Sequence, residues 1–312
     1  MHQSSATHRP ALVVVNPAAS RLADERRRTA LIRDVAHAVH DRLGAGPEVV
    51  AGGHTEAVAA LGDAADRPLV VVAGGDGSVR EAATVLAGTS VPLAIVPGGT
   101  GNVLAGALGV GARSRALAAI RAGRTRRIDL GRARWGDAAA AIDERVFTVA
   151  CGMGLDARVM AAAEGEWKRH VGFGAYVGAT VRELARLEPA LFRIDRDGTA
   201  LAITGLVVLV ANCGDLIPGR LGARRPIDPT DGHLDLIVVG GRTIVDGLRG
   251  AVELLVRRET IDGSVVRGDV SAVRIEADPP QPIQVDGDHF AATWLEATVL
   301  PGALTVLGPV DR

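Results

Sequence analysis

The first third of this sequence repeats one pattern, in which a short aliphatic and β-branched run ends at a turn marked by glycine or proline and helix-period residues follow. The runs are Leu12–Val15, Leu69–Ala73 and Leu93–Val96, and apolar residues recur at helical spacing between positions 31 and 43. Strands that alternate with helices form parallel sheets. The pattern therefore predicts an α/β, doubly wound, Rossmann-like domain, with the three turns along one edge of the sheet, where such folds bind ligands.

From about Ile128 the pattern changes to longer, alternating strands, which predict a β-rich second domain. A chain of 312 residues with 47% hydrophobic residues exceeds what one core usually needs, so we expect two domains, 1–127 and 128–312. The last residues could pack back on the first domain. Arg124–Arg127 is the expected hinge, and one helical insert is expected at Val159–Leu187. The expected strands are Val146–Ala150, Ala202–Ala211, Leu234–Val239, Val270–Glu276 and Trp294–Val299.

The composition excludes several classes of protein. Lys+Arg 35 nearly balance Asp+Glu 36, for a formal net charge of −1, which argues against an electrostatic nucleic-acid binder. The longest apolar run, around Leu206–Ala211, falls short of the roughly 20 residues that a membrane span needs, so we expect only peripheral membrane contact. Cys151 and Cys213 lie in apolar runs without a CxxC partner. We interpret them as buried thiols in a reducing, cytoplasmic compartment.

The turn Gly74–Ser78 concentrates three glycines around the carboxylate of Asp76. Glycines let backbone N–H groups approach a phosphate, and a carboxylate beside a phosphate needs a cation. Asp76 would then hold Mg²⁺ or take a proton from an attacking hydroxyl. Taken alone, the pentapeptide favours a tight turn with Asp76 as a helix N-cap. A second glycine-rich turn, Pro97–Asn102, is expected at the same edge, and its Thr100 hydroxyl and Asn102 amide favour a phosphate site.

A third turn, Ile227–Gly232, concentrates oxygen ligands for a hard cation, with Asp228 and Asp231 as the carboxylates. The alternative is an Asx-rich turn without a cation. For His233, the backbone carbonyl is a better Mg²⁺ ligand than the imidazole, because Mg²⁺ prefers oxygen. Other histidines, including His37 and His40, have no partner at metal-ligand spacing, and we expect them to be solvated.

Five motifs follow one another in an order that resembles the diacylglycerol kinase catalytic-domain family, which includes bacterial lipid kinases and the sphingosine and ceramide kinases. A weaker match is Arg127–Gly131. The five motifs are Asn16-Pro17 with Ser20, Gly74–Ser78, Pro97–Asn102, Asp231–Asp235 and Val285–Asp288.

The resemblance implies an N-terminal α/β domain that binds ATP, a C-terminal β-sandwich domain and an active site in the cleft between them. It also implies a lipid substrate at a membrane surface. Asp228, Asp231 and the carbonyl of His233 would hold a structural Mg²⁺. Asp288 falls on the family's proposed catalytic base, and Asp76 is the second candidate catalytic residue. The residues that the resemblance places around ATP are Asn16, Ser20, Gly74, Gly75, Asp76, Gly77, Ser78, Thr100 and Asn102.

Four positions depart from the family pattern. Ser78 replaces threonine and keeps the hydroxyl, whereas Arg21 and Arg80 stand where glycine and asparagine are usual. Each arginine either contacts phosphate or faces solvent. Asp288 replaces glutamate and shortens the side chain by one methylene. A displacement of about 1 Å at a reacting group can cost on the order of 100-fold in rate.

Three functions remain open from the sequence. The first is an ATP- and Mg²⁺-dependent lipid kinase that phosphorylates the hydroxyl of a diacylglycerol-like lipid, mainly by positioning and by offsetting charge. The second is a catalytically weak homologue that binds nucleotide or lipid. The third is a soluble-cofactor kinase of the NAD-kinase type, which the Asp231–Asp235 and Val285–Asp288 motifs disfavour.

Overall fold

The computed structural model of the chain describes residues 9–137, 142–154, 189–214, 227–241 and 265–309. The chain forms two compact units: unit 1 contains residues 1–128 and 302–312, and unit 2 contains residues 129–301. The boundary expected between 127 and 128 falls one residue before this division. The helical insert expected at Val159–Leu187 lies outside the described residues.

Unit 1 is built on a parallel sheet with the strand order β2-β1-β3-β4. The three strands expected from the sequence are confirmed as β1 (Leu12–Val15), β3 (Val70–Gly74) and β4 (Leu93–Pro97), and every residue in them is buried. β2 (Glu48–Ala51) was not expected, because it is a short edge strand whose residues are mostly exposed. The end of β15, at Val306, pairs in parallel with β4.

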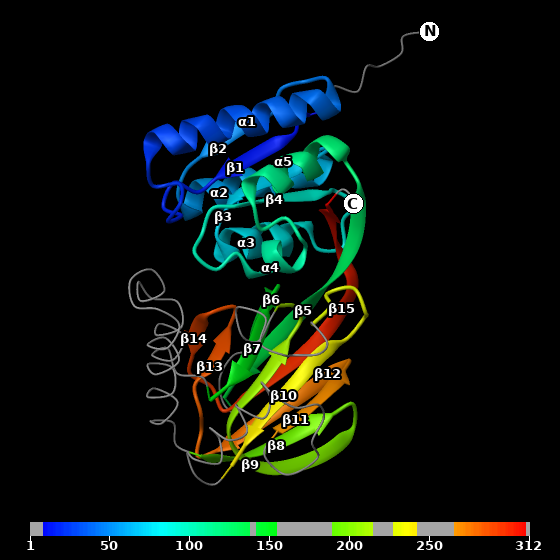
Figure 1. Ribbon diagram of the computed structural model, residues 1–312. Coiled ribbons are helices and arrows are strands. Elements are labelled where there is room, and N and C mark those ends of the chain that lie inside the picture. The colour runs from blue at the N-terminus through cyan, green and yellow to red at the C-terminus, as the bar shows by residue number, and fades with distance from the viewer. Residues whose placement is uncertain (1–8, 138–141, 155–188, 215–226, 242–264, 310–312) are drawn as a thin grey trace. The chain divides into compact units, whose positions relative to one another are not determined.

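Helices cover both faces of this sheet, with α1 and α5 on one face and α2 and α3 on the other (Figure 1). α1 begins where the Asp24 carboxylate accepts a hydrogen bond from the N–H of Arg27, and it ends at the left-handed Gly44. The helices are α1 (Glu25–Leu43), α2 (His54–Gly62), the 3₁₀ helix η1 (Ala64–Asp66), α3 (Asp76–Leu86), α4 (Val103–Ala107) and α5 (Arg113–Ala122).

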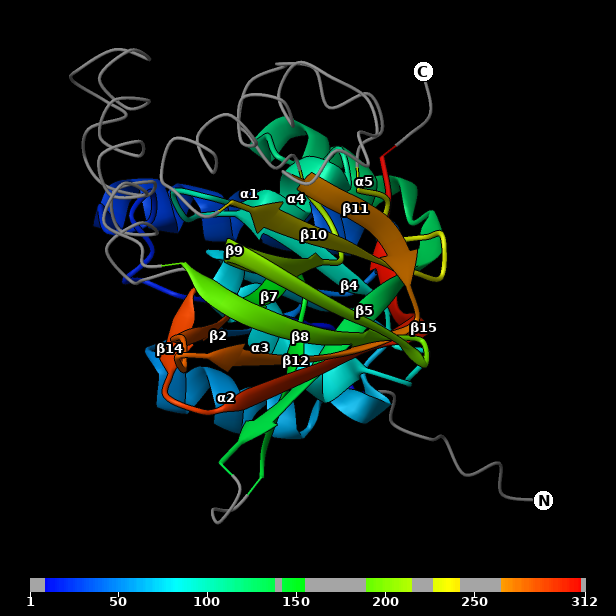
Figure 2. The same ribbon diagram turned by 90° about the horizontal axis from the view of Figure 1, so that it is seen from below.

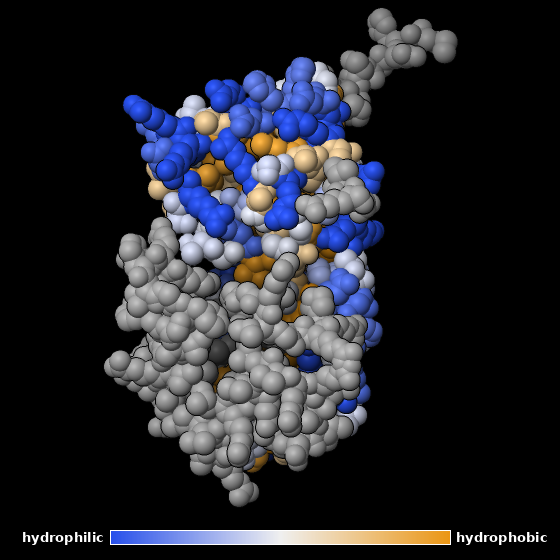
Figure 3. Space-filling view, viewed as in Figure 1, coloured by the Kyte–Doolittle hydropathy of each residue, from blue (hydrophilic) through white to orange (hydrophobic). Residues whose placement is uncertain are grey.

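The apolar spacing in the first helix predicts its packing. Leu31, Val35 and Val39 are buried, while the opposite face of α1 is polar. Figure 3 shows the hydrophilic surface over this helix. His37 and His40 are exposed, which confirms that they are solvated.

Unit 2 contains a sheet with the strand order β14-β13-β7-β9-β8-β12-β15. β10 pairs with β9 and β11, and β5 pairs with β15 and β6; the long strands lie side by side in Figure 2. Phe147, Phe192 and Trp135 belong to its buried hydrophobic core. The strands are β5 (Thr125–Gly136), β6 (Asp143–Phe147), β7 (Ala150–Met153), β8 (Ala190–Arg196), β9 (Thr199–Ala211), β10 (Leu234–Gly240), β11 (Val265–Val270), β12 (Ala272–Asp278), β13 (Ile283–Val285), β14 (Asp288–Phe290) and β15 (Trp294–Leu307).

Two of the expected strands are each interrupted by an aspartate from elsewhere in the chain. The run Val146–Ala150 is split between β6 and β7, because the N–H groups of residues 148, 149 and 150 donate to the carboxylate of Asp286. The run Val270–Glu276 is split at Ser271, because the N–H groups of residues 271 and 272 donate to the carboxylate of Asp197. A backbone N–H that donates to a side chain is lost to the sheet ladder, so both expectations of one continuous strand were wrong.

Arg124–Arg127, the expected hinge, overlaps the start of β5 at Thr125 and lies directly before the division between the two units. Cys151 and Cys213 are buried, as expected, with exposed fractions of 0% and 2%. Within the described parts of the chain, we find no helix that is both long enough and apolar enough to cross a membrane.

Candidate active site

Three loops follow the carboxyl ends of β1, β3 and β4, and short side chains tie them together. The amide Nδ2 of Asn16 donates to Ser78 Oγ at 3.0 Å, while its Oδ1 accepts from the N–H of Ala18 at 2.9 Å. The hydroxyls of Ser20 and Thr100 share a hydrogen bond of 3.1 Å. These residues therefore lie together at one edge of the sheet, as predicted from the sequence.

Glycines allow the second and third loops to touch through their backbones. Gly98 N–H donates to Gly74 O at 2.8 Å, and a Cβ at Gly99 would lie 2.6 Å from the Cα of Gly75. No real side chain tolerates that distance to a backbone atom, so Gly99 is required by the packing itself. Gly77 differs, because a Cβ there would meet no atom within 4 Å. The packing of the described residues therefore gives no reason for glycine at position 77.

Asp76 is the first residue of α3, behind the N-cap position of Gly75. Its Oδ1 accepts a hydrogen bond of 2.8 Å from the N–H of Val103, the first residue of α4. The alternative that Asp76 caps its own helix is wrong, because it stabilises the start of the next one. The carboxylate nevertheless stays at the amino end of α3, where the helix dipole favours anions.

Asn102 has a left-handed backbone, with φ 50° and ψ 45°, and is only 8% exposed. Its Oδ1 accepts from Gly99 N–H at 2.9 Å and its Nδ2 donates to Gly99 O at 2.6 Å. Both ends of the amide therefore bond to the loop that carries Thr100. Asn102 shapes the loop, and Thr100 and Ser20 are exposed at its surface.

Arg21 and Arg80 differ in their surroundings. Arg21 is exposed, and its backbone N–H donates to Gly98 O at 2.9 Å, which adds another link between the loops. Arg80 lies half-buried on α3.

In unit 2, the turn 228–233 carries the candidate cation ligands. Asp228 Oδ1 accepts from the N–H and hydroxyl of Thr230 at 3.0 and 2.7 Å, and Asp231 Oδ1 accepts from the N–H of His233 at 3.0 Å. These contacts shape an Asx-type turn. Among the residues that the structure describes, no three acidic, histidine or cysteine side chains gather at metal-binding distance.

Asp129 fixes this turn by hydrogen bonds, and no function is expected for this residue from the sequence. It is 3% exposed, its N–H donates to Pro229 O at 2.6 Å, and its Oδ2 accepts from the N–H of Gly232 at 2.7 Å. The signal was present in the sequence, since a lone carboxylate inside the apolar stretch Ile128–Leu130 needs a buried hydrogen-bond partner.

The second candidate site turn of unit 2 joins β13 to β14 and carries Asp286, Gly287 and Asp288. Asp286 and Gly287 have φ of 47° and 87°, as a two-residue hairpin requires. The Asp286 carboxylate accepts from the N–H groups of residues 148 to 150 and from the hydroxyl of Thr148, at 2.8–3.1 Å. Burial raises the pKa of the Asp286 carboxyl above its usual range, while these hydrogen bonds act in the opposite direction.

Asn212 connects the anchors of the two turns. This residue is fully buried, and its Nδ2 donates to Asp129 O and to Thr148 O, both at 3.0 Å. Thr148 in turn donates to Asp286. One hydrogen-bond chain therefore runs from the candidate cation turn to the turn that carries Asp288, entirely within unit 2.

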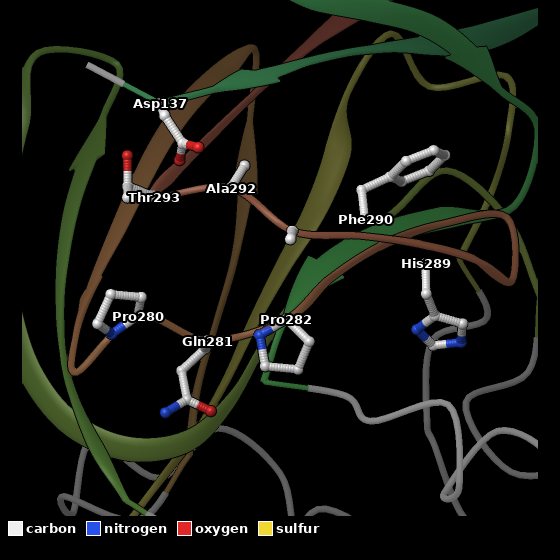
Figure 4. Close-up of a pocket in the computed structure, with 9 residues that line it drawn as sticks. Asp137, Pro280, Gln281, Pro282, His289, Phe290, Ala292 and Thr293 are labelled. Carbon is white, nitrogen blue, oxygen red and sulfur yellow. The ribbon is translucent and has the colours of Figure 1, made fainter. Parts of the chain in front are cut away.

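Asp288 begins β14 with its side chain 50% exposed, and its Oδ2 lies 2.5 Å from Arg145 Nη1. The same hairpin borders a pocket of about 590 Å³ (Figure 4). His289 and Phe290 line this pocket together with prolines, alanines and a few polar side chains. Its lining residues are Asp137, Pro280, Gln281, Pro282, His289, Phe290, Ala291, Ala292 and Thr293.

An α/β unit with glycine-rich loops after its strands is typical of nucleotide-binding proteins, and here an antiparallel β-rich unit follows it. Comparison with known families agrees. The model of the family described as "Diacylglycerol kinase catalytic domain" matches residues 10–133, and that described as "YegS C-terminal NAD kinase beta sandwich-like domain" matches residues 149–308. The chain belongs to the diacylglycerol kinase family. Its fold is the family's α/β domain with a C-terminal β-sandwich domain, as expected.

Individual relatives and solved structures are also similar to this chain. A diacylglycerol kinase of Mycobacterium tuberculosis is 30% identical over 242 residues, which cover 77% of this chain and 76% of that protein. An uncharacterised Synechocystis protein is 26% identical over 165 residues, which cover 52% of this chain and 38% of that protein. A crystal structure of a diacylglycerol kinase from Bacillus anthracis has a TM-score of 0.69 at 20% identity and covers 96% of both chains. At this identity, the structural likeness shows a shared fold.

Proposed function

We propose that this protein is an ATP- and Mg²⁺-dependent lipid kinase that transfers the γ-phosphoryl group to the hydroxyl of a diacylglycerol-like lipid. Membership of a kinase family implies a phosphotransferase that uses ATP. The observation that carries the proposal for this chain is the set of three interlocked loops after β1, β3 and β4. They bring glycine backbone, hydroxyls and the amino end of α3 to one sheet edge.

ATP would bind to these loops through the backbone more than through charge. Gly75, Gly77 and the N–H groups of the first turn of α3 would face the phosphates, because helix amino ends favour anions. Ser20 and Thr100 would supply hydroxyls to the same phosphates. Asn16, Gly74, Ser78 and Asn102 would hold the loops in place, as their hydrogen bonds and close contacts indicate. The function of Gly77 would be to leave room for the ligand.

Mg²⁺ fits the donors of the turn 228–233. Asp228 and Asp231 offer carboxylate oxygens and His233 offers a backbone carbonyl, and a protein commonly holds Mg²⁺ with only one or two carboxylates and several waters. The small number of side-chain ligands among the described residues is therefore compatible with Mg²⁺. When bound, this ion would fix the turn, and Mg²⁺ on ATP would offset charge on the phosphates.

Asp288 would act as the general base toward the lipid hydroxyl, with Asp76 beside the phosphates. A base must come within about 2.6–3.2 Å of the hydroxyl, directly or through one water. The half-exposed carboxylate of Asp288 is accessible to a substrate, whereas the enclosed carboxylate of Asp286 is fully engaged by four donors. The structure therefore favours Asp288 over its neighbour as the base. The lipid would approach from a membrane surface on the cytoplasmic side.

The test is to incubate the protein with γ-labelled ATP, Mg²⁺ and a lipid extract, and to identify the labelled product. We expect label in a lipid phosphomonoester, formed by the wild type and not by Asp76→Asn. Binding of ATP without any labelled product would favour the catalytically weak homologue. Label in a water-soluble product would instead favour a soluble-cofactor kinase.

A further inference from the structure

An arginine on a neighbouring strand holds the carboxylate of Asp288. Arg145 lies on β6, and its Nη1 is 2.5 Å from Asp288 Oδ2. The two residues are 143 positions apart in the sequence. The ion pair therefore depends on the tertiary structure that brings β6 and the β13–β14 hairpin together.

Arg145 also lies over an aromatic ring. Its guanidinium carbon lies 5.0 Å from the ring centroid of Phe290, and that ring lies 4.4 Å from the ring of Trp135. Trp135 is 3% exposed and belongs to the core of unit 2. Phe290, labelled in Figure 4, stands two residues after Asp288, so both side chains share one face of β14. The guanidinium thus joins the candidate base to the hydrophobic core.

Folding stability does not explain this arrangement well. The side chains of Arg145 and Asp288 are 33% and 50% exposed, and ion pairs in such positions typically contribute only about 0–1 kcal/mol. Orientation is a better explanation, since a half-exposed aspartate can otherwise turn among its rotamers. Aspartate is one methylene shorter than the glutamate usual at this position, so its reach leaves little tolerance for misplacement.

We propose that Arg145 is a positioning residue, which fixes the Asp288 carboxylate in the orientation that accepts the proton of the lipid hydroxyl. The inference rests on the proposed function, because it takes Asp288 as the base. Arg145 itself gains or loses no proton in the reaction. It acts through the ion pair and through its contact with Phe290.

Unit 2 contains a matched control for this chemistry. Arg274 also lies over an aromatic ring, 4.5 Å from the centroid of Trp294, and also pairs with a carboxylate, Glu276, at 3.0 Å. The side chain of Arg274 is 42% exposed, close to the exposure of Arg145. Arg274→Met therefore removes the same type of interaction without touching the candidate base.

The experiment measures kcat and the KM for ATP with a short-chain diacylglycerol in detergent micelles. Arg145→Met keeps much of the apolar stem, and we expect it to lower kcat by about 10- to 100-fold with little change in the KM for ATP. Arg145→Lys should restore part of kcat, because it keeps a charge near Asp288 but not the planar guanidinium. Arg274→Met should keep the wild-type kcat. Thermal unfolding of each variant checks that the fold is retained.

A double mutant separates positioning from an independent effect. In an Asp288→Asn background, Arg145→Met should cause no further loss of kcat, since the group it positions no longer acts as a base. Wild-type or raised kcat in Arg145→Met, or an equal loss in both backgrounds, would overturn the role of Arg145 and leave the proposed function intact. Full kcat in Asp288→Asn would instead reject Asp288 as the base, and the Arg145 inference with it.

Discussion

The glycine-rich loops of unit 1 and the two candidate site turns of unit 2 are held in different ways. In unit 1, backbone approaches backbone, as at Gly99 and Gly75, and short side chains such as Asn16 and Ser78 add single hydrogen bonds. In unit 2, the carboxylates of Asp129 and Asp286 fix the turns by accepting hydrogen bonds from backbone N–H groups that are distant in the sequence. A phosphate site needs space for the ligand next to the backbone. A carboxylate that must point in one direction instead needs a turn whose backbone is fixed by hydrogen bonds.

The largest expected effect tests the carboxylate of Asp76 in unit 1, which we propose lies beside the phosphates. Asp76→Ala should abolish phosphoryl transfer in the labelled-ATP assay, because the residue stands beside the proposed phosphate site. Its stability should fall by only about 1 kcal/mol, the typical cost of losing one helix-terminal hydrogen bond. Asp76→Asn keeps an oxygen for Val103 N–H and should match the wild type in thermal unfolding while remaining inactive. Full activity of folded Asp76→Asn would contradict the assignment.

The next effect tests the anchors of unit 2. Asp286→Ala leaves three backbone N–H groups without their acceptor, so we expect the free energy of unfolding to fall by roughly 2–3 kcal/mol. Asp197→Ala is the matched control, since Asp197 also has a positive φ and also accepts from two N–H groups across a strand break, but is exposed. Asp197→Ala should lower the free energy of unfolding by less than Asp286→Ala does. Denaturant unfolding of both variants measures the difference.

Thiol reactivity reports on the same anchor independently. Cys151 pairs with Val285, next to Asp286, and burial together with the nearby Asp286 charge raises the pKa of its thiol. The native wild type should therefore react slowly with a thiol reagent. Faster labelling of Cys151 in Asp286→Ala than in Asp286→Asn, which removes the same charge but keeps an acceptor oxygen, would show that the turn has opened locally. Equal labelling rates would argue that Asp286 does not hold it.

A smaller effect compares two glycines of unit 1. Gly99→Ala places a methyl group against the backbone of Gly75 and should destabilise the protein by about 1–3 kcal/mol. In Gly77→Ala, the added methyl group meets no described atom within 4 Å. The free energy of unfolding should rise by up to about 1 kcal/mol, because alanine favours helix. If ATP approaches the backbone there, Gly77→Ala should still bind ATP more weakly in titration calorimetry. Unchanged ATP affinity would indicate that the phosphates do not bind beside α3.

The smallest expected effect concerns the cation turn. A ligand that binds the native state at ten times its Kd stabilises it by about 1.4 kcal/mol, so Mg²⁺ should raise the melting temperature of the wild type by a few degrees. Asp231→Asn should abolish this shift. Asp195→Asn is a control, because Asp195 also accepts a backbone N–H within a turn, from Gly198, but is no candidate ligand. Equal shifts in all three proteins would mean that the turn 228–233 binds no Mg²⁺.

The sequence alone determined three strands of unit 1 and the loops that follow them. Runs such as Leu69–Ala73 are buried on both faces of a parallel sheet, so their continuous apolar character identifies them without long-range information. The glycine-rich loops follow directly from where those strands end. The mostly exposed edge strand Glu48–Ala51 gave no such signal. The order of the motifs also indicated the family, which the comparisons confirmed.

Only the tertiary structure decided where the strands of unit 2 break and which residues hold its turns. The run Val146–Ala150 has strand propensity from Val146 to Val149. It is split because its N–H groups donate to Asp286, more than a hundred residues later. The roles of Asp129, Asn212 and Arg145 likewise depend on partners distant in the sequence. Local patterns encode which backbone conformation a segment prefers. A buried carboxylate or an exposed ion pair finds its partner only when the chain has folded, because that choice depends on which distant donors the fold brings within hydrogen-bonding distance.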